Sequence, residues 1–176
     1  GIMRAASGTS EPQWDEDIAD MITVEFHDPE DYGHILFSES DIYLGTDGEA
    51  SLTVPPEFNA LYFVSIKHRN SIETTTSEPV SFSGNNIDLS FGDPSEVYGD
   101  NLKESSDGYY LIFSGDINGD GVVDRNGDLE EVAQSSLQIL RGYNDDDING
   151  DGLVDTLDMN IIDNNSHSGV AAVLPD

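Results

Sequence analysis

One six-residue phrase occurs twice in the C-terminal part of this chain, and it restricts the fold more than any other feature. The copies read Asp-Ile-Asn-Gly-Asp-Gly and begin at Asp116 and Asp147. Each places oxygen-bearing side chains at its first, third and fifth positions and a glycine at the sixth. A hard cation such as Ca²⁺ takes six to eight oxygen ligands, and loops that bind it supply them from alternate positions around a glycine turn. The repeat therefore predicts two calcium-binding loops.

The residues after each phrase complete the ligand set. Position 7 supplies a backbone carbonyl, so its apolar side chain is expected to point into the core, and position 9 is an aspartate. Position 12 of the second loop is Asp158, whereas the first loop has Gly127 there and a carboxylate one residue later, at Asp128. We interpret this as a one-residue insertion, and the sequence leaves open whether it preserves the first site. The predicted ligands are Asp116, Asn118, Asp120, Val122, Asp124 and Asp128 in the first loop, and Asp147, Asn149, Asp151, Leu153, Asp155 and Asp158 in the second.

A helix is predicted after each loop. Apolar residues recur at helical spacing from Leu129 to Leu140, with Gly142 placed to end the helix. A shorter apolar set, Met159 to Ile162, comes after the second loop and is expected to end at Asn164-Asn165. No amphipathic helix enters the first loop, because Tyr109–Phe113 reads as a strand. Each unit is therefore a loop with only an exiting helix.

This tandem arrangement resembles a type I dockerin. The resemblance covers about residues 114–176 and is based on the two repeated phrases, their spacing, and the aspartate, Asp158, that closes the second loop. It implies a calcium-dependent protein–protein interaction module that docks onto a cohesin-like domain of a bacterial extracellular complex, for example a polysaccharide-degrading assembly.

The resemblance also implies where the partner would bind. In dockerins, loop positions 10 and 11 and the helices that come after them contact the cohesin. The two pairs here differ from each other, and neither is the small hydroxyl pair common in that family. The implied partner-binding residues are Arg125, Asn126, Thr156 and Leu157.

The N-terminal half has the pattern of a β-protein. Short runs of alternating apolar and polar residues, separated by turns, predict a β-sandwich of about seven strands over residues 19–91. Residues 27–31 are expected to form a turn. Residues 1–18 are predicted to be a flexible leader, 92–108 a linker and 109–176 the dockerin-like domain, so the fold class is mainly β plus small α. The expected strands lie near residues 21–26, 35–44, 50–54, 58–68, 80–82 and 87–91.

The hairpin in the middle of this half resembles the transthyretin-like sandwiches of carboxypeptidase regulatory domains. The resemblance covers about residues 18–91 and is carried by Asp47-Gly-Glu-Ala-Ser-Leu-Thr-Val-Pro55 and then by Tyr62-Phe-Val-Ser-Ile66. It implies a fold and no activity.

Charge and composition exclude several classes of partner. The chain has 36 acidic and 6 basic residues, for a net charge of −30. Nucleic acid is therefore excluded as a natural partner, because phosphate binding needs clustered Lys and Arg, and the same charge argues against anionic membrane surfaces. Two acidic surface turns without metal are the alternative to the calcium loops, and carboxylate repulsion disfavours them.

Location and assembly can be inferred from the same features. There are no cysteines, so disulfides contribute nothing, and no apolar run approaches the ~18 residues of a membrane span. No signal peptide is recognisable. We expect an extracellular or cell-surface monomer, because sites of this type suit the calcium concentrations found outside cells.

No catalytic motif is present, so we expect no enzyme activity. The histidines show no ligand spacing, and His68 is expected to bond a neighbouring carboxylate. Two other functions stay open. One is a structural stalk, in which the dockerin-like unit packs on its own sandwich. The other is a carbohydrate-binding or hydrolytic sandwich, for which Tyr32, Tyr43, Phe58 and Tyr98 are candidate aromatic residues; Trp14 is expected to pack at a domain edge instead.

Overall fold

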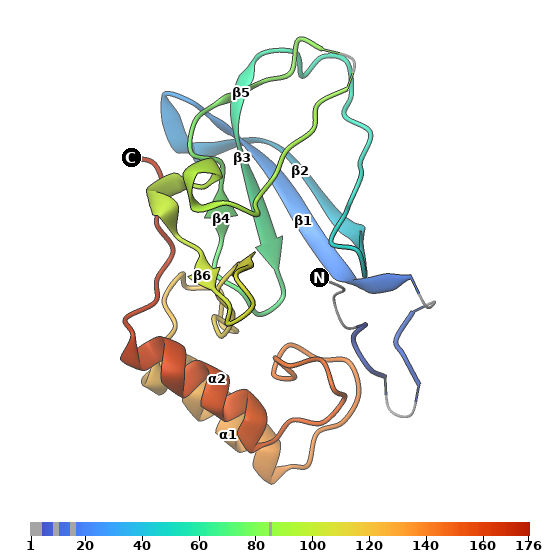
Figure 1. The fold of residues 1–176 in the computed structure, drawn as a ribbon, viewed down its shortest axis with the longest axis vertical. Helices are drawn as coiled ribbons and strands as arrows, with labels where there is room; N and C mark the ends of the chain where they lie inside the picture. Colours follow the sequence, from blue (N-terminus) through green and yellow to red (C-terminus); the bar gives the residue numbers. More distant parts are fainter. Residues whose placement is uncertain (1–4, 9–10, 15–16, 85) are drawn as a thin grey trace.

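The computed structural model describes residues 5–8, 11–14, 17–84 and 86–176, and it confirms a mainly β chain with a small α-helical part (Figure 1). The strands are β1 (Ile18–Asp28), β2 (Asp31–Gly45), β3 (Leu61–His68), β4 (Thr74–Thr75), β5 (Val80–Ser81), β6 (Lys103–Glu104) and β7 (Tyr110–Leu111). The helical elements are the 3₁₀ turns η1 (Pro94–Glu96) and η2 (Tyr98–Asp100), the π-turn η3 (Arg125–Leu129), and the helices α1 (Glu130–Leu137) and α2 (Thr156–His167).

Strands β1 to β5 form one antiparallel sheet in the order β2-β1-β3-β4, with β5 also paired to β3. β1 lies in the middle, where Phe26 is opposite Phe37 of β2 and Val64 of β3. Because side chains alternate between the faces of a strand, Ile22, Val24 and Phe26 of β1 share one face. That face carries the first hydrophobic core, which comprises Ile22, Val24, Phe26, Ile42, Tyr62, Val64 and Phe82.

The layer that covers this core is irregular. The sequence predicts strands at 50–54 and 87–91, but the structure has none there, and Ala50 makes only a single bridge to Leu44. Apolar side chains from both runs still pack against the core. The first run leads into Pro55-Pro56, which has no N–H groups to donate to a ladder.

The opposite face of β1 and β3 is polar and also buried. The turn predicted at 27–31 is present but shorter: β1 continues to Asp28, the turn comprises residues 29–30, and His27 lies inside the strand. Glu25 and His27 point to this face, with Ser65 of β3 opposite Glu25. His27 is 3% exposed and Glu25 8%. Buried charged side chains are costly unless they are paired or bound, so the groups on this face need partners within the protein.

The two helices are antiparallel. They lie side by side in Figure 1, and an ion pair of 2.5 Å joins Arg125 Nη2, just before α1, to Asp163 Oδ1 of α2. The predicted end of α2 at Asn164-Asn165 is wrong, because the helix continues to His167. Asn165 is buried inside it, and its amide donates to the carbonyl of Ser114 at 2.7 Å.

Each of the two repeated loops pairs with the segment after the other loop's helix. Val123 N donates to Val170 O at 3.0 Å, and Val154 N donates to Leu140 O at 3.2 Å. This arrangement buries position 8 of each loop, Val123 and Val154, in the second core. Position 7 was expected to point inward, but Val122 is 44% exposed. Side chains alternate along this short paired segment, so position 8 points into the core and position 7 points outward.

A residue from the β half lies inside the helical half. Ile72, in the connection between β3 and β4, is fully buried and belongs to the second core. Its backbone N donates to Phe113 O at 3.0 Å. Asn70 from the same connection donates through Nδ2 to the carbonyls of Asp145 and Asp147, at 3.2 and 3.3 Å. The second loop is therefore attached to the sheet.

A charged group beside this connection links the halves. His68 Nε2 lies 3.0 Å from Asp20 Oδ2, which is the carboxylate contact expected for this histidine. Arg69 Nε donates to Asp20 at 3.2 Å and its guanidinium lies 4.7 Å from the ring centre of Tyr143, whose hydroxyl donates to Asp20 at 2.8 Å. Burial alone would raise the pKa of Asp20, but His68 and Arg69 lower it to about 2. Trp14 packs edge-on against Tyr143 at 4.7 Å.

The predicted linker and leader both make contacts. Within 92–108, Val97 is 1% exposed and bridges to Thr76, while Lys103 Nζ lies 3.2 Å from Asn165 Oδ1. In the leader, Ser7 N donates to the carbonyl of Gly150 at 3.0 Å, on the second loop. Leader residues 1–4, 9–10 and 15–16 lie outside the described residues.

Candidate metal sites

The side chains at positions 1, 3 and 5 of the first loop turn inward. Asp116 accepts hydrogen bonds from the backbone N–H groups of Asp120, at 3.1 Å, and Gly121, at 3.0 Å. Asn118 Oδ1 accepts from Asp120 N at 2.8 Å, and Asp120 Oδ1 from Val122 N at 2.9 Å. These bonds wind the chain into a tight loop lined with oxygen atoms.

The second loop repeats this framework bond for bond. Asp147 accepts from the N–H groups of Asp151, at 3.1 Å, and Gly152, at 2.8 Å. Asn149 Oδ1 accepts from Asp151 N at 2.9 Å, and Asp151 Oδ1 from Leu153 N at 3.0 Å. The duplicated sequence therefore gives duplicated geometry.

The closing carboxylate of the second loop is Asp158. It is fully buried and accepts from the backbone N–H groups of Ile148, Asn149 and Asp155, at 2.9, 3.0 and 2.9 Å. Asp155 and Asp158 also form the capping box that begins α2, which stabilises the first turn of the helix. The loop and the start of the helix are thus one hydrogen-bonded unit.

Asp128 occupies the corresponding place in the first loop in spite of the insertion. It is fully buried and accepts from the N–H groups of Ile117, Asn118 and Asp124, at 2.9, 3.4 and 2.8 Å. The extra residue is absorbed by the π-turn η3, whose wider winding adds one residue without displacing helix α1.

Gly127 lies where the turn passes close to the Asn118 side chain. A Cβ atom at Gly127 would collide with Nδ2 of Asn118 and lie 3.3 Å from Asp124 Oδ1. Asp124 itself accepts from Asn126 N at 2.9 Å and from Gly127 N at 2.7 Å, and so caps the turn. A larger residue at position 127 would therefore displace the Asn118 amide, which lies at a ligand position of the loop.

Both loops concentrate negative charge, and Arg125 of the first loop pairs with Asp163 of α2 rather than with a carboxylate of its own loop. Burial and the neighbouring carboxylate of Asp128 raise the pKa of Asp116, and burial and Asp158 do the same for Asp147. Within the described part of the chain, no ion pair reaches any of these four carboxylates. Carboxylate, amide and carbonyl oxygens in this order suit a hard cation such as Ca²⁺.

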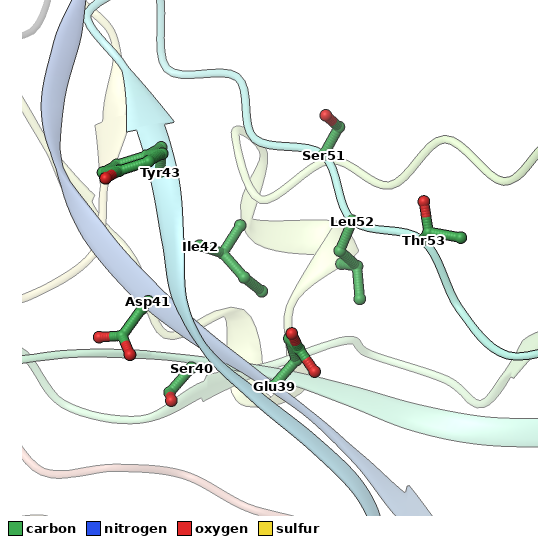
Figure 2. Close-up of a pocket in the computed structure, with 8 residues that line it drawn as sticks. All are labelled: Glu39, Ser40, Asp41, Ile42, Tyr43, Ser51, Leu52 and Thr53. Atoms are coloured by element: carbon green, nitrogen blue, oxygen red, sulfur yellow. The ribbon is translucent and has the colours of Figure 1, made fainter.

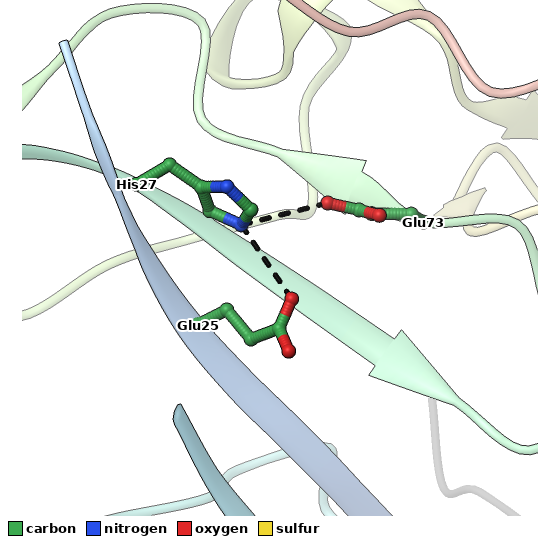
Figure 3. Close-up of side chains that lie close together, drawn as sticks. All are labelled: Glu25, His27 and Glu73. Carbon is green, nitrogen blue, oxygen red and sulfur yellow. Dashed lines mark ion pairs between the residues drawn. The ribbon is translucent and has the colours of Figure 1, made fainter. Parts of the chain in front are cut away.

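A different group of side chains lies closer together than the acids of either loop. Among the described residues, Glu25, His27 and Glu73 alone bring one ligand atom each within 4.8 Å of one another (Figure 3). This group is not predicted from the sequence, because Glu73 is remote in the chain from Glu25 and His27. Glu25 and His27 two residues apart on a strand were the available signal, since that spacing puts both side chains on one face.

The four residues proposed to bind the partner are all exposed. Arg125 and Asn126 lie at the start of η3, and Thr156 and Leu157 at the start of α2. Because the helices are antiparallel, the two pairs lie at opposite ends of the helix pair. The structure therefore does not bring these four residues together.

The candidate aromatic residues of the sheet do not form a common platform. Tyr32 is 8% exposed and stacks on the His27 ring, and Phe58 packs against the first core. Tyr98 packs edge-on against Phe63 at 6.2 Å. Tyr43 is 56% exposed and borders an open hollow of about 440 Å³, in which Ile42 and Leu52 lie between β2 and the segment after it (Figure 2).

Comparisons with protein-family models, with curated proteins and with solved structures found no match for this chain. No helix among the described residues has the length and apolar character needed to cross a membrane.

Proposed function

We propose that this chain is a non-catalytic, calcium-stabilised binding module of a secreted or cell-surface bacterial protein. Its C-terminal part would be a tandem dockerin-like unit that binds two Ca²⁺ ions, and its N-terminal part a sandwich with an irregular second layer. One observation carries the proposal: both loops fold by the same set of hydrogen bonds around a fully buried closing carboxylate, Asp128 or Asp158.

The proposed mechanism couples metal binding to folding. Each loop holds two buried carboxylates that repel each other when no cation is bound. Calcium offsets that repulsion in the folded chain and has no preformed site in the unfolded chain, so its binding free energy adds to the free energy of unfolding. Extracellular calcium would then keep the two helices ordered.

A calcium titration tests the proposal directly. Calorimetry on chelator-treated protein is expected to give two equivalents of bound calcium, with a parallel gain of helical circular dichroism. Magnesium provides the control, because it demands a tighter octahedral site and keeps its water ligands. One equivalent would show that the insertion at Gly127 disables the first loop, and an absence of calcium binding would contradict the proposal.

The surface left for a partner is asymmetric. Leu157 is 56% exposed at the start of α2, while Leu137, predicted to lie on the apolar face of α1, is 85% exposed at the end of α1. Ile139, just beyond, is 63% exposed. In an antiparallel pair the end of α1 and the start of α2 lie at the same end. We infer that a cohesin-like domain with an apolar face docks there, and that the Arg125–Asn126 end contributes less.

Leu157→Asp tests this docking surface. Against cohesin domains immobilised as a panel, in calcium, the variant is expected to bind at least 10-fold more weakly, because a charge replaces an exposed apolar anchor. Asn126→Asp places the same charge at the other end and should change affinity less than threefold. Equal losses in both variants would contradict the asymmetric surface, and a panel without any binder would contradict the cohesin-like partner.

The structural-stalk alternative is supported by the connection between β3 and β4. Ile72 lies in the second core and Asn70 holds the second loop, so the dockerin-like unit packs on its own β half. This packing leaves the exposed end of the helix pair unobstructed. A rigid support and a docking surface are therefore compatible in one chain.

A further inference from the structure

The buried polar face of the sheet contains a histidine with an unpartnered nitrogen. His27 Nδ1 lies 2.7 Å from the carbonyl oxygen of Tyr32. A carbonyl only accepts, so Nδ1 carries a proton, and the tautomer that this contact selects has its lone pair on Nε2. That atom is buried and has no hydrogen-bond partner. A lone pair without a donor, in a residue 3% exposed, is costly unless something binds it.

Two carboxylates face this lone pair. His27 Nε2 lies 3.6 Å from Glu25 Oε2 and 3.6 Å from Glu73 Oε1 (Figure 3). These distances are too long for hydrogen bonds. Two ligands that share a tetrahedral metal ion, each at about 2.1 Å, are roughly 3.4 Å apart. The separations therefore match a common metal ion better than they match direct contacts.

Surrounding residues hold these ligands in place. The Tyr32 ring stacks on the His27 ring at 4.1 Å and an interplanar angle of 4°. The Tyr32 hydroxyl donates to Glu73 Oε1 at 2.5 Å and also lies 2.6 Å from Ser65 Oγ. One tyrosine thus fixes both the tautomer of the histidine and the direction of a carboxylate, which is the role of the outer shell in metal sites.

Lys67 is the one cationic side chain that contacts both carboxylates among the described residues. Its Nζ lies 2.7 Å from Glu25 Oε2 and 3.4 Å from Glu73 Oε2. At 2.7 Å the Lys67 ammonium group is in direct contact with the Glu25 oxygen that also faces His27. The Lys67 side chain is 39% exposed, so its ammonium group can turn to solvent and release the carboxylates.

We propose that Glu25, His27 and Glu73 bind a divalent transition-metal ion of the zinc class, and that Lys67 competes with that ion for the two carboxylates. Imidazole with carboxylate favours zinc and similar ions, whereas calcium takes oxygen ligands alone. The site is thus chemically distinct from the two loops and does not depend on their function.

Cobalt(II) provides the test, because its visible absorption reports binding to a nitrogen-containing site of low coordination number. The full chain is titrated with Co²⁺ in excess calcium, which occupies the loops, and zinc affinity is then obtained by displacement. One equivalent is expected for the unaltered chain. His27→Gln should weaken binding at least 10-fold, and Lys67→Met should strengthen it by about 10-fold, within the range that outer-shell changes cause.

The matched control is His34→Gln, since His34 lies on β2 of the same hairpin with its side chain 61% exposed. This variant should bind cobalt as the unaltered chain does, with circular dichroism confirming that each variant folds. An unaltered chain that binds no cobalt overturns the proposal, whatever the Lys67 variant does. Equal binding by the His27 and His34 variants overturns it as well.

Discussion

Asp147→Ala is expected to abolish one of two calcium equivalents and to lower the melting temperature in calcium by about 10 °C. The residue is fully buried at position 1 of the second loop and accepts two backbone hydrogen bonds. When the free calcium concentration is about 1,000 times the dissociation constant of a site, binding there adds about 4 kcal/mol to the free energy of unfolding. In a chain of this size each kcal/mol shifts the melting temperature by about 2–4 °C. Differential scanning calorimetry with and without chelator measures the change.

Asp145→Ala is the matched control for this experiment. Asp145 is exposed and lies two residues earlier, and only its backbone carbonyl contacts Asn70. Its substitution should leave both calcium equivalents and shift the melting temperature by no more than about 2 °C, as for other surface changes. An Asp147 variant that melts with the unaltered protein in excess calcium would contradict the role assigned to the loop.

Ile72→Ala is expected to lower the free energy of unfolding by about 2–5 kcal/mol, the range for deleting a fully buried isoleucine side chain. Ile72 comes from the β half but lies in the second core beside Val123 and Val154, which come directly after position 7 of the two loops. A cavity there should therefore also weaken calcium binding. Urea unfolding gives the stability, and calorimetry gives the calcium affinity.

Ile35→Ala makes the same substitution on β2, where the side chain is 45% exposed, and should cost less than about 1 kcal/mol. The comparison of the two variants also distinguishes halves that are coupled through a shared core from halves that fold independently. If Ile72→Ala destabilised the sheet alone and left calcium affinity unchanged, the halves would fold independently and the shared core would have no energetic role.

Local signals predicted the loops well because their geometry is local. Side chains at alternate positions and a glycine at position 6 define one tight turn. The backbone N–H groups that donate to Asp116 and to Asp147 lie no more than five residues further along the chain. The exit of a helix from each loop is predictable for the same reason. The ends of the helices were less predictable. Asn165 lies inside α2, where its side-chain amide donates to the carbonyl of Ser114, and helical propensity gives no information about that distant partner.

The sequence by itself determined two oxygen-lined loops, the helices after them and a preceding β half, because each depends on the spacing of neighbouring residues. Only the tertiary structure decided that a π-turn absorbs the insertion and leaves Asp128 in the closing position, that Ile72 enters the helical core, and that Glu73 lies beside His27. The physical reason is that periodicity along a strand reports which face a side chain takes. The residues that cover that face are decided by strand pairing and by connections that bring distant parts of the chain together.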